Sequence, residues 1–232
     1  SSDLAAGADF AMLETQCDLA EARAALLAAN ALSFPAVVSF TFEPGGRTLM
    51  GNPPEACATL AEALGALALG INCSCGPEEL LPVVRAMRVA TSLPLIVQPN
   101  AGMPELREGA TTYPYTPQLM ASKMQTFLEL GLDGLGGCCG STPEHLRKIA
   151  DLVPRLHPQH PALPQRVCGR RAVLSLQDAL ADFDEVRLPD GASVEEGIDE
   201  MLLGDTGKPA LLLDAGTWTP EDLVALLQEG GD

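Results

Sequence analysis

A strand-to-helix junction is encoded by Gly136-Gly137-Cys138-Cys139-Gly140-Ser141-Thr142-Pro143-Glu144. The glycines permit backbone turns that other residues avoid. Ser141 and Glu144 have the spacing of a helix capping box, and Pro143 suits the first turn of a helix. In parallel α/β folds such a junction lies at the carboxyl end of a strand, where functional sites are usually built.

The two adjacent cysteines have three interpretations: small buried hydrophobic side chains, a vicinal disulfide, or two ligands of one metal ion. A third thiol favours the metal, because Cys73 also ends an apolar run and is followed by Gly76 and Pro77. Three thiolates with an open fourth position are typical of a zinc site that binds an exogenous ligand. Cys75 lies close to the same site and is an alternative to Cys73.

The other cysteines have no such setting. Cys17, Cys57 and Cys168 are expected to be ordinary core or surface residues. Seven cysteines are an odd number, so the pattern favours metal or thiol chemistry over a disulfide framework.

Apolar runs and helical segments alternate along the first two thirds of the chain. Strands are expected at residues 9–14, 36–42, 68–73, 94–100 and 131–139. Helices are expected at residues 18–30, 54–67, 77–90, 118–130 and 143–153, with a loop at 101–117. This alternation predicts an α/β fold built from parallel, right-handed βαβ units.

Several of these segments together resemble the zinc-dependent homocysteine S-methyltransferases. The resemblance rests on Asn72-Cys73, on residues 98–104 and on residues 136–143, and residues 46–49 and Glu14-Thr15 also fit. It extends from residue 9 to about residue 153. The most similar members are the homocysteine-binding domains of cobalamin-dependent methionine synthase.

The resemblance implies an eight-stranded, TIM-barrel-like (β/α) fold, of which about five βα units match this chain. The first three strands of the family pattern have no counterpart before Ser1. An incomplete barrel would leave sheet edges open. We therefore expect them to be covered by a second copy of the chain, by an N-terminal barrel half on the same or another polypeptide, or by the tail.

The resemblance also implies a site. Cys73, Cys138 and Cys139 would bind Zn²⁺ and activate the thiol of homocysteine, which would then accept a methyl group to give methionine. No side chain of the chain would itself be the nucleophile.

The amino acid substrate would be positioned by Glu14, Asn72 and Asn100. The favoured methyl donor is methylcobalamin, bound with a cobalamin or folate module elsewhere, and betaine and S-methylmethionine are alternatives. Two other functions stay open: a zinc-binding but inactive fragment or subunit that needs a partner, and a methyltransferase that acts on a different thiol.

The chain has 14 basic and 31 acidic residues, a net charge of −17, which argues against nucleic acid or an anionic membrane as a partner. It contains no run of about twenty apolar residues and no signal-peptide pattern, so we expect it to be cytoplasmic.

Three parts are predicted along the chain. Residues 1–155 form the partial barrel, residues 156–164 a Pro-rich linker, and residues 165–232 an acidic α/β tail. In the tail, apolar runs lie at 172–176 and 210–213, and amphipathic helices are expected at 193–203 and 219–228.

Overall fold

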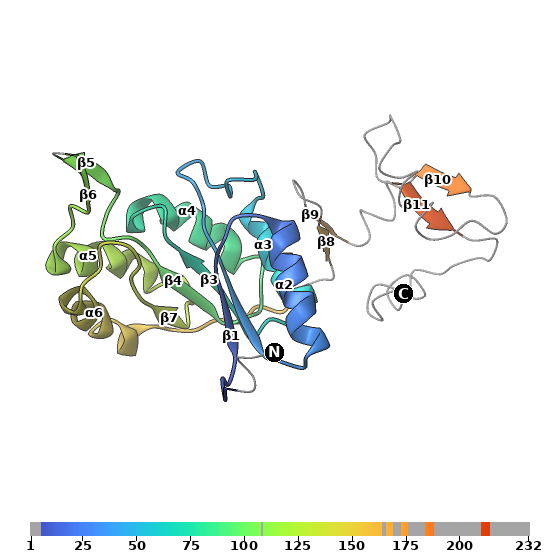
Figure 1. Cartoon of the computed structure of the whole chain (residues 1–232), viewed down its shortest axis with the longest axis horizontal. Helices are drawn as coiled ribbons and strands as arrows, with labels where there is room; N and C mark the ends of the chain where they lie inside the picture. Colours follow the sequence, from blue (N-terminus) through green and yellow to red (C-terminus); the bar gives the residue numbers. More distant parts are fainter. Residues whose placement is uncertain are drawn as a thin grey trace. The chain divides into compact units, whose positions relative to one another are not determined.

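The computed structural model describes residues 6–107 and 109–163, together with four short strands in the last third of the chain (Figure 1). These strands are β8 (Arg166–Cys168), β9 (Val173–Ser175), β10 (Asp184–Arg187) and β11 (Ala210–Leu213). The chain divides into two compact units, Ser1–Val173 and Leu174–Asp232. The predicted boundaries at residues 155 and 164 stay predictions.

The first unit is built on a five-stranded parallel sheet with the order β1-β2-β3-β4-β7. Its strands are β1 (Ala11–Gln16), β2 (Ala36–Phe40), β3 (Ala68–Asn72), β4 (Leu95–Gln98) and β7 (Gly134–Leu135). The helices that follow them are α2 (Leu19–Ala31), α3 (Pro54–Ala63), α4 (Pro77–Arg88), α5 (Pro117–Met124) and α6 (Pro143–Ala150). The described residues therefore contain the expected five βα units, an incomplete set for an eight-stranded barrel.

The sheet has one strongly apolar face, on which the helices pack. Val38 and Phe40 of β2 and Ile71 of β3 are fully buried there, in one core with Leu26 of α2 and Met87 of α4. Because side chains alternate along a strand, the opposite face carries other residues. These are mainly small or polar: Ser39, Gly70, Asn72, Gly134 and Gly136.

Strand ends differ from the prediction where hydrogen bonding outweighs the apolar pattern. β1 begins at Ala11, which pairs with Ala36 of β2, and continues to Gln16, so Glu14 lies inside the strand instead of ending it. β7 is only two residues long, although the Gly136 N–H still donates to the Val97 carbonyl of β4 at 2.9 Å. α5 stops at Met124 and tightens into the 3₁₀ turn Gln125–Phe127.

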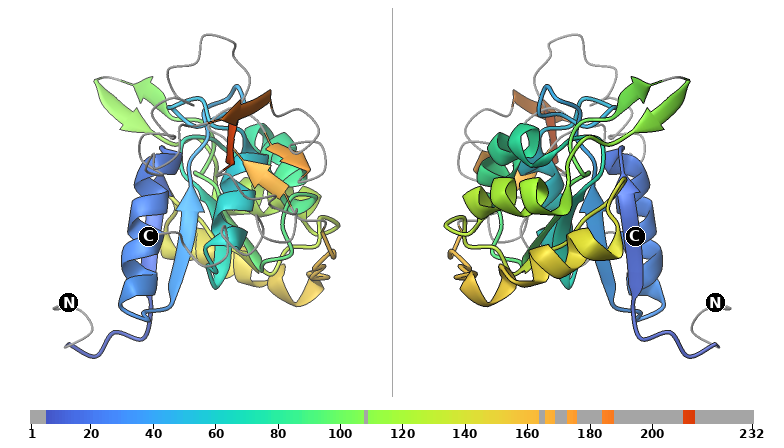
Figure 2. Two further views of the ribbon diagram at one scale, coloured as in Figure 1. Left: turned by 90° about the vertical axis from the view of Figure 1, so that its right-hand side faces the viewer. Right: turned by 90° about the vertical axis from the view of Figure 1, so that its left-hand side faces the viewer.

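The expected loop 101–117 contains a hairpin that the sequence pattern did not reveal. Its strands are β5 (Glu105–Arg107) and β6 (Ala110–Thr112), paired antiparallel. The hairpin projects from the first unit in all three ribbon views (Figures 1 and 2).

The predicted capping box of α6 is wrong by one residue. Thr142, not Ser141, is the N-cap, and His145 takes the place expected for Glu144. The Thr142 N–H donates to His145 Nδ1 at 3.1 Å, so the proton of the neutral ring lies on Nε2, which bonds the Tyr115 carbonyl at 2.8 Å. His145 is thus a buried structural residue, as expected for a histidine outside the site.

The Pro-rich segment packs against other parts of the first unit, to which it belongs. The Gln159 N–H donates to the Gly131 carbonyl at 3.1 Å. The His160 ring bonds the Ser92 carbonyl through Nδ1 at 2.9 Å and reaches Asp133 through Nε2 at 3.2 Å. His160 therefore has a structural role in the described part of the chain.

In the second unit β10 and β11 pair in parallel. The helices expected at 193–203 and 219–228 lie outside the described residues, and so does the side chain of Cys168. Among the helices that the structure describes, none has the length and apolar character required to cross a membrane.

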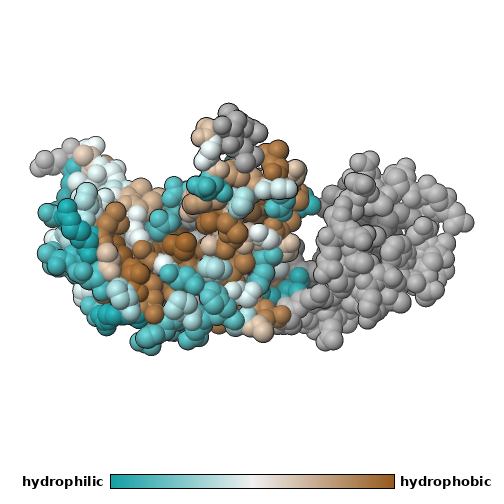
Figure 3. All heavy atoms as spheres, turned by 90° about the horizontal axis from the view of Figure 1, so that it is seen from below, coloured by the Kyte–Doolittle hydropathy of each residue, from teal (hydrophilic) through white to brown (hydrophobic). Residues whose placement is uncertain are grey.

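Apolar side chains reach the surface in several places on the first unit. Seen from below, brown patches lie between hydrophilic margins (Figure 3). Phe10 is 53% exposed and Met12, on the edge strand β1, is 40% exposed. Such exposure is consistent with a sheet that requires further cover on this edge.

Ile71 provides a test of the core. We expect Ile71→Ala to lower the free energy of unfolding by about 2–5 kcal/mol, because it removes fully buried methyl groups between the sheet and the helices. Urea denaturation of the whole chain measures this. Leu67→Ala, at a position that is 52% exposed, is the control and should change the value by less than about 0.5 kcal/mol. Equal losses in both variants would contradict the assigned core.

Candidate metal centre

Three of the four thiols singled out in the sequence converge at the carboxyl end of the sheet. The Sγ atoms of Cys73, Cys138 and Cys139 all lie within 4.8 Å of one another, and those of Cys73 and Cys139 are 3.6 Å apart. In a tetrahedral zinc–thiolate site with bonds of about 2.3 Å, sulfur atoms are about 3.8 Å apart. The separations fit three ligands of one metal ion.

An unusual backbone conformation directs the side chain of Cys73 into the cluster. Cys73 and Ser74 have φ values of +63° and +54°, a region that costs residues other than glycine about 1–3 kcal/mol each. Hydrogen bonds hold this turn. The Cys73 N–H donates to Gln98 O at 3.2 Å, the Cys75 N–H to Cys73 O at 2.7 Å, and the Ser74 and Thr41 hydroxyls are 2.8 Å apart.

Cys138 and Cys139 reach the cluster because the chain turns where β7 has ended. The Cys138 N–H donates to Pro99 O at 2.8 Å, and its carbonyl accepts from Ser141 N at 3.1 Å. The Cys139 carbonyl accepts from Ala101 N at 2.9 Å. Both cysteines are thiols, so the vicinal disulfide is absent from this part of the chain.

Burial, together with the neighbouring Cys139 and Cys138, raises the pKa of the Cys73 thiol to about 12, against a lowering contribution from the Ser74 backbone. The metal-free Cys73 side chain therefore holds its proton at neutral pH. A metal ion must displace that proton to bind the sulfur.

Cys75 points away from the cluster. It is fully buried, and its Sγ donates to the Phe42 carbonyl at 3.4 Å. Burial raises its pKa to about 11, with added contributions from Glu79 and Glu43, so it is a neutral core thiol. The geometry favours Cys73 over Cys75 as the third thiol. Of the other cysteines, Cys57 lies in the core and Cys17 is half-buried.

Asn100 and Asn72 lie beside the thiols and are both buried. Asn100 Oδ1 accepts from the Cys139 N–H at 3.1 Å, which fixes the backbone of one thiol. Asn72 Nδ2 donates to Cys138 Sγ at 3.8 Å. Both amides thus contact residues of the cluster.

Glu14 lies on β1, exposed, one residue before Thr15. Thr15 has φ of +59° and bonds Asn72, with its N–H donating to Oδ1 at 3.2 Å. This hydrogen bond connects β1, which carries the Glu14 carboxylate, to the end of the sheet where the thiols lie. The role of Glu14 toward a substrate stays a prediction.

Tyr113, which follows β6, lies in the segment 101–117, a loop whose tyrosines are expected from the sequence to cover the site. Its hydroxyl is hydrogen-bonded to the Cys139 side chain, and burial together with this contact raises the pKa of Tyr113. The ring fits only because Gly140 has no side chain: a Cβ there would lie 2.3 Å from Tyr113 Cγ. Ser39, which is bonded to Asn72, was missed, although a polar residue within the apolar run 36–42 was a usable signal for it. Thr15, which is also bonded to Asn72, entered the sequence analysis only as part of the resemblance.

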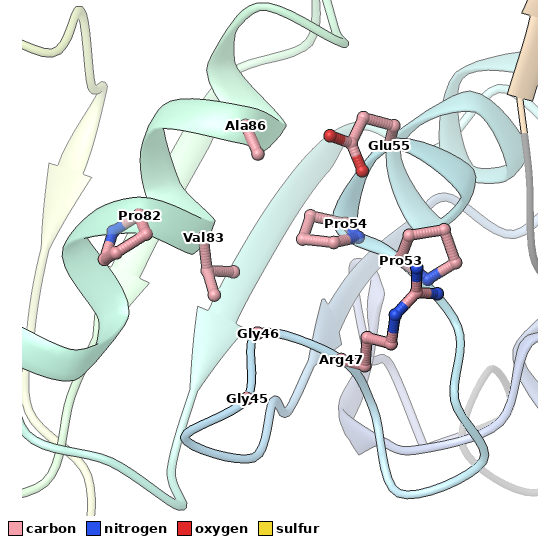
Figure 4. Close-up of a pocket in the computed structure, with 9 residues that line it drawn as sticks. All are labelled: Gly45, Gly46, Arg47, Pro53, Pro54, Glu55, Pro82, Val83 and Ala86. Carbon is pink, nitrogen blue, oxygen red and sulfur yellow. The ribbon is translucent and has the colours of Figure 1, made fainter.

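Residues 46–49, which belong to the sequence resemblance, lie apart from the cluster. They border an open pocket between the loop after β2 and helices α3 and α4 (Figure 4). Arg47 Nη1 donates to the Gly51 carbonyl at 2.9 Å, and buried Thr48 bonds Asn52 at 3.1 Å. These contacts give the segment a structural role in shaping its loop.

The cluster as a whole suits a thiophilic metal ion that must also accept a ligand from solution. It supplies three sulfur donors, and Cys139 is exposed while Cys73 and Cys138 are half-buried. Tetrahedral coordination by three protein ligands leaves one position for an exogenous group.

The sequence of this chain is similar to the sequences of curated enzymes. The chain is 36% identical over 156 residues to the methionine synthase of Mycobacterium leprae, and 36% identical over 154 residues to that of Mycobacterium tuberculosis. The matches cover 64% and 63% of this chain but only 13% of each relative. The chain thus spans a small part of the length of these relatives.

Solved structures give the same fold. The metallated form of the Escherichia coli homocysteine methyltransferase MmuM is 29% identical, with a TM-score of 0.52, over 66% of this chain and 47% of that one. Its oxidized form is 26% identical, with a TM-score of 0.52, over 64% of this chain and 47% of that one.

The family model described as homocysteine S-methyltransferase matches residues 2–153. This range includes all three clustered thiols and extends over well more than half of the chain. The resemblance noted in the sequence is confirmed, and the chain belongs to the homocysteine S-methyltransferase family.

Proposed function

We propose that this chain binds Zn²⁺ through Cys73, Cys138 and Cys139 and carries the homocysteine site of a methionine synthase. The observation that supports this most directly is the group of three thiols within 4.8 Å at the carboxyl end of the sheet. The metallated form of a family member supports metal binding as well. Three thiolates and no carboxylate or histidine in the cluster favour a thiophilic ion over Mg²⁺ or Ca²⁺.

Zinc bound in this way would favour the deprotonated, nucleophilic form of a fourth thiol, which in this proposal is homocysteine. The chain's own residues have other tasks. Glu14 pairs with the amino group of the substrate. Asn100 fixes the backbone of Cys139. The substrate thiol, and no side chain of the protein, attacks the methyl group to give methionine.

The methyl donor belongs to the part of the enzyme outside this chain. The relatives are methionine synthases, of which this chain matches 13%, so a methylcobalamin or folate module has ample room elsewhere. An N-terminal barrel half or a second copy of the chain would cover the exposed edge at β1.

Zinc content and homocysteine binding test this function together. We expect about one Zn²⁺ per chain with three sulfur ligands, and a fourth sulfur when homocysteine is added, as counted by X-ray absorption. Cys138→Ser should lose most of the metal, whereas Cys75→Ser, which alters a thiol outside the cluster, should keep it. A wild-type chain that holds zinc but never gains the fourth sulfur would contradict the assignment of homocysteine.

Zinc affinity should depend on pH. Because the pKa of Cys73 is raised to about 12, its proton must leave when zinc binds, and acid must weaken binding. We expect the apparent affinity to fall by about tenfold or more for each unit between about pH 8 and about pH 6. Competition with a chromophoric chelator measures this, and an indicator dye records the released protons. Affinity that is flat across this range would refute binding through a protonated thiol.

Glu14→Gln tests the substrate carboxylate. Losing a charge-assisted bond to the amino group should weaken homocysteine binding by about tenfold, while zinc affinity stays unchanged because Glu14 is not among the clustered ligands. Isothermal titration of the zinc-loaded chain with homocysteine gives the homocysteine affinity, and competition with a chromophoric chelator gives the zinc affinity. Glu21→Gln on the surface of α2 is the matched control. If both variants bind homocysteine like wild type, Glu14 is not a substrate residue.

A further inference from the structure

The side chain of Asn72 uses every hydrogen-bonding position that it has. It is fully buried at the end of β3. Its Oδ1 accepts from the Thr15 N–H at 3.2 Å and from the Ser39 hydroxyl. Its Nδ2 donates to Thr15 Oγ1 at 2.7 Å and to Cys138 Sγ at 3.8 Å. A primary amide has two donors and two acceptor lone pairs, and all four are occupied.

The orientation of this amide follows from its partners. The Thr15 backbone N–H can only donate, so the amide oxygen must face it. The amide nitrogen then faces Thr15 Oγ1 and Cys138 Sγ. The sulfur of Cys138 therefore receives an N–H, and exchanging the amide oxygen and nitrogen would set the amide N–H against the Thr15 N–H, two donors facing each other.

Two neighbouring strands are shaped to hold the amide in place. Ser39 on β2 is fully buried, and a Cβ at Gly70 would lie only 2.8 Å from Ser39 Cβ, so glycine at 70 makes room for it. Thr15 takes φ of +59°, which is costly for a β-branched residue but directs both its N–H and its hydroxyl at Asn72.

We propose that Asn72, locked by Ser39 and Thr15, is a positioning residue that orients Cys138 and does not bind the substrate. The proposal rests on the proposed function, in which Cys138 is a zinc ligand. An N–H donor fixes the direction of the sulfur and stabilises its negative charge, as outer hydrogen bonds do in other metal sites. A substrate could bond Asn72 only by displacing one of its four partners.

Ser39→Ala and Asn72→Ala test this role in the full chain. If Asn72 positions Cys138, zinc affinity should fall by about tenfold for Ser39→Ala and by up to about a hundredfold for Asn72→Ala. Homocysteine affinity of the fully zinc-loaded proteins should stay within about twofold of wild type, because no substrate contact is lost. Unchanged zinc affinity with weakened homocysteine binding would overturn the proposal and make Asn72 a substrate residue.

Thr41→Val is the matched control. It removes another buried hydroxyl at the end of β2, one that bonds Ser74 next to Cys73 and has no bond to Asn72. In metal-free protein, labelling by iodoacetamide, resolved by peptide, should change severalfold at Cys138 in the Ser39 variant and stay unchanged there in the Thr41 variant. The rate changes because the Asn72 amide no longer holds the Cys138 sulfur in one direction.

The labelling experiment also separates the two proposals. If wild type binds no zinc, the proposed function fails, yet a selective change in the labelling rate at Cys138 would still support the positioning role. An unchanged Cys138 rate in both Ser39→Ala and Asn72→Ala, with circular dichroism showing both variants folded, would overturn the positioning role whatever the metal content.

Discussion

Parallel strand pairing is the constraint on which this site depends. Because every strand of the sheet runs in the same direction, all carboxyl ends meet at one edge. Cys73 follows β3 and the cysteine pair follows β7, with β4 between them. Hydrogen bonds from Cys73 N to Gln98 O and from Cys138 N to Pro99 O anchor both thiol segments to the intervening strand. Residues 65 or more positions apart in sequence thus reach one point, and none of them has to leave its own βα unit.

The same edge concentrates backbone strain. All but one of the positive φ values recorded for non-glycine residues lie at Thr15, Cys73 and Ser74, directly at strand ends beside the thiols. Each costs about 1–3 kcal/mol, so local bonds must hold it in place. Thr15 is held by Asn72, and Ser74 by Thr41. Backbone strain that specific hydrogen bonds hold in place is expected at a site whose geometry is needed for function and not for stability alone.

The sequence was sufficient to predict the five βα units and the thiol cluster, since glycine-flanked strand ends are a local signal. It could not fix the start of β1, because Asp9 and Phe10 continue the pattern while register with Ala36 begins only at Ala11. The hydrogen bond between Thr142 and His145 could not be predicted for a different reason. The His145 ring is also hydrogen-bonded to the Tyr115 carbonyl, which lies far away in sequence. Ser39 and Tyr113 act through contacts across strands and loops, and neither a polar residue in an apolar run nor a tyrosine in a loop indicates which residue it contacts.

In the proposed site, three thiolates around a divalent cation would leave one net negative charge on a chain that is already acidic. The described ion pairs of its arginines and lysines engage carboxylates, such as Arg88 with Asp133 and Lys123 with Glu78. At the cluster the structure offers neutral donors instead: the amide of Asn72 on Cys138 and the hydroxyl of Tyr113 on Cys139. Neutral donors stabilise thiolate charge without competing with the metal for it, whereas a lysine or arginine at that distance would repel the cation. In the proposed chemistry, an electron-rich site of this kind would keep a fourth thiol reactive. The uncharged hydrogen-bond donors would then contribute to that reactivity together with the thiols.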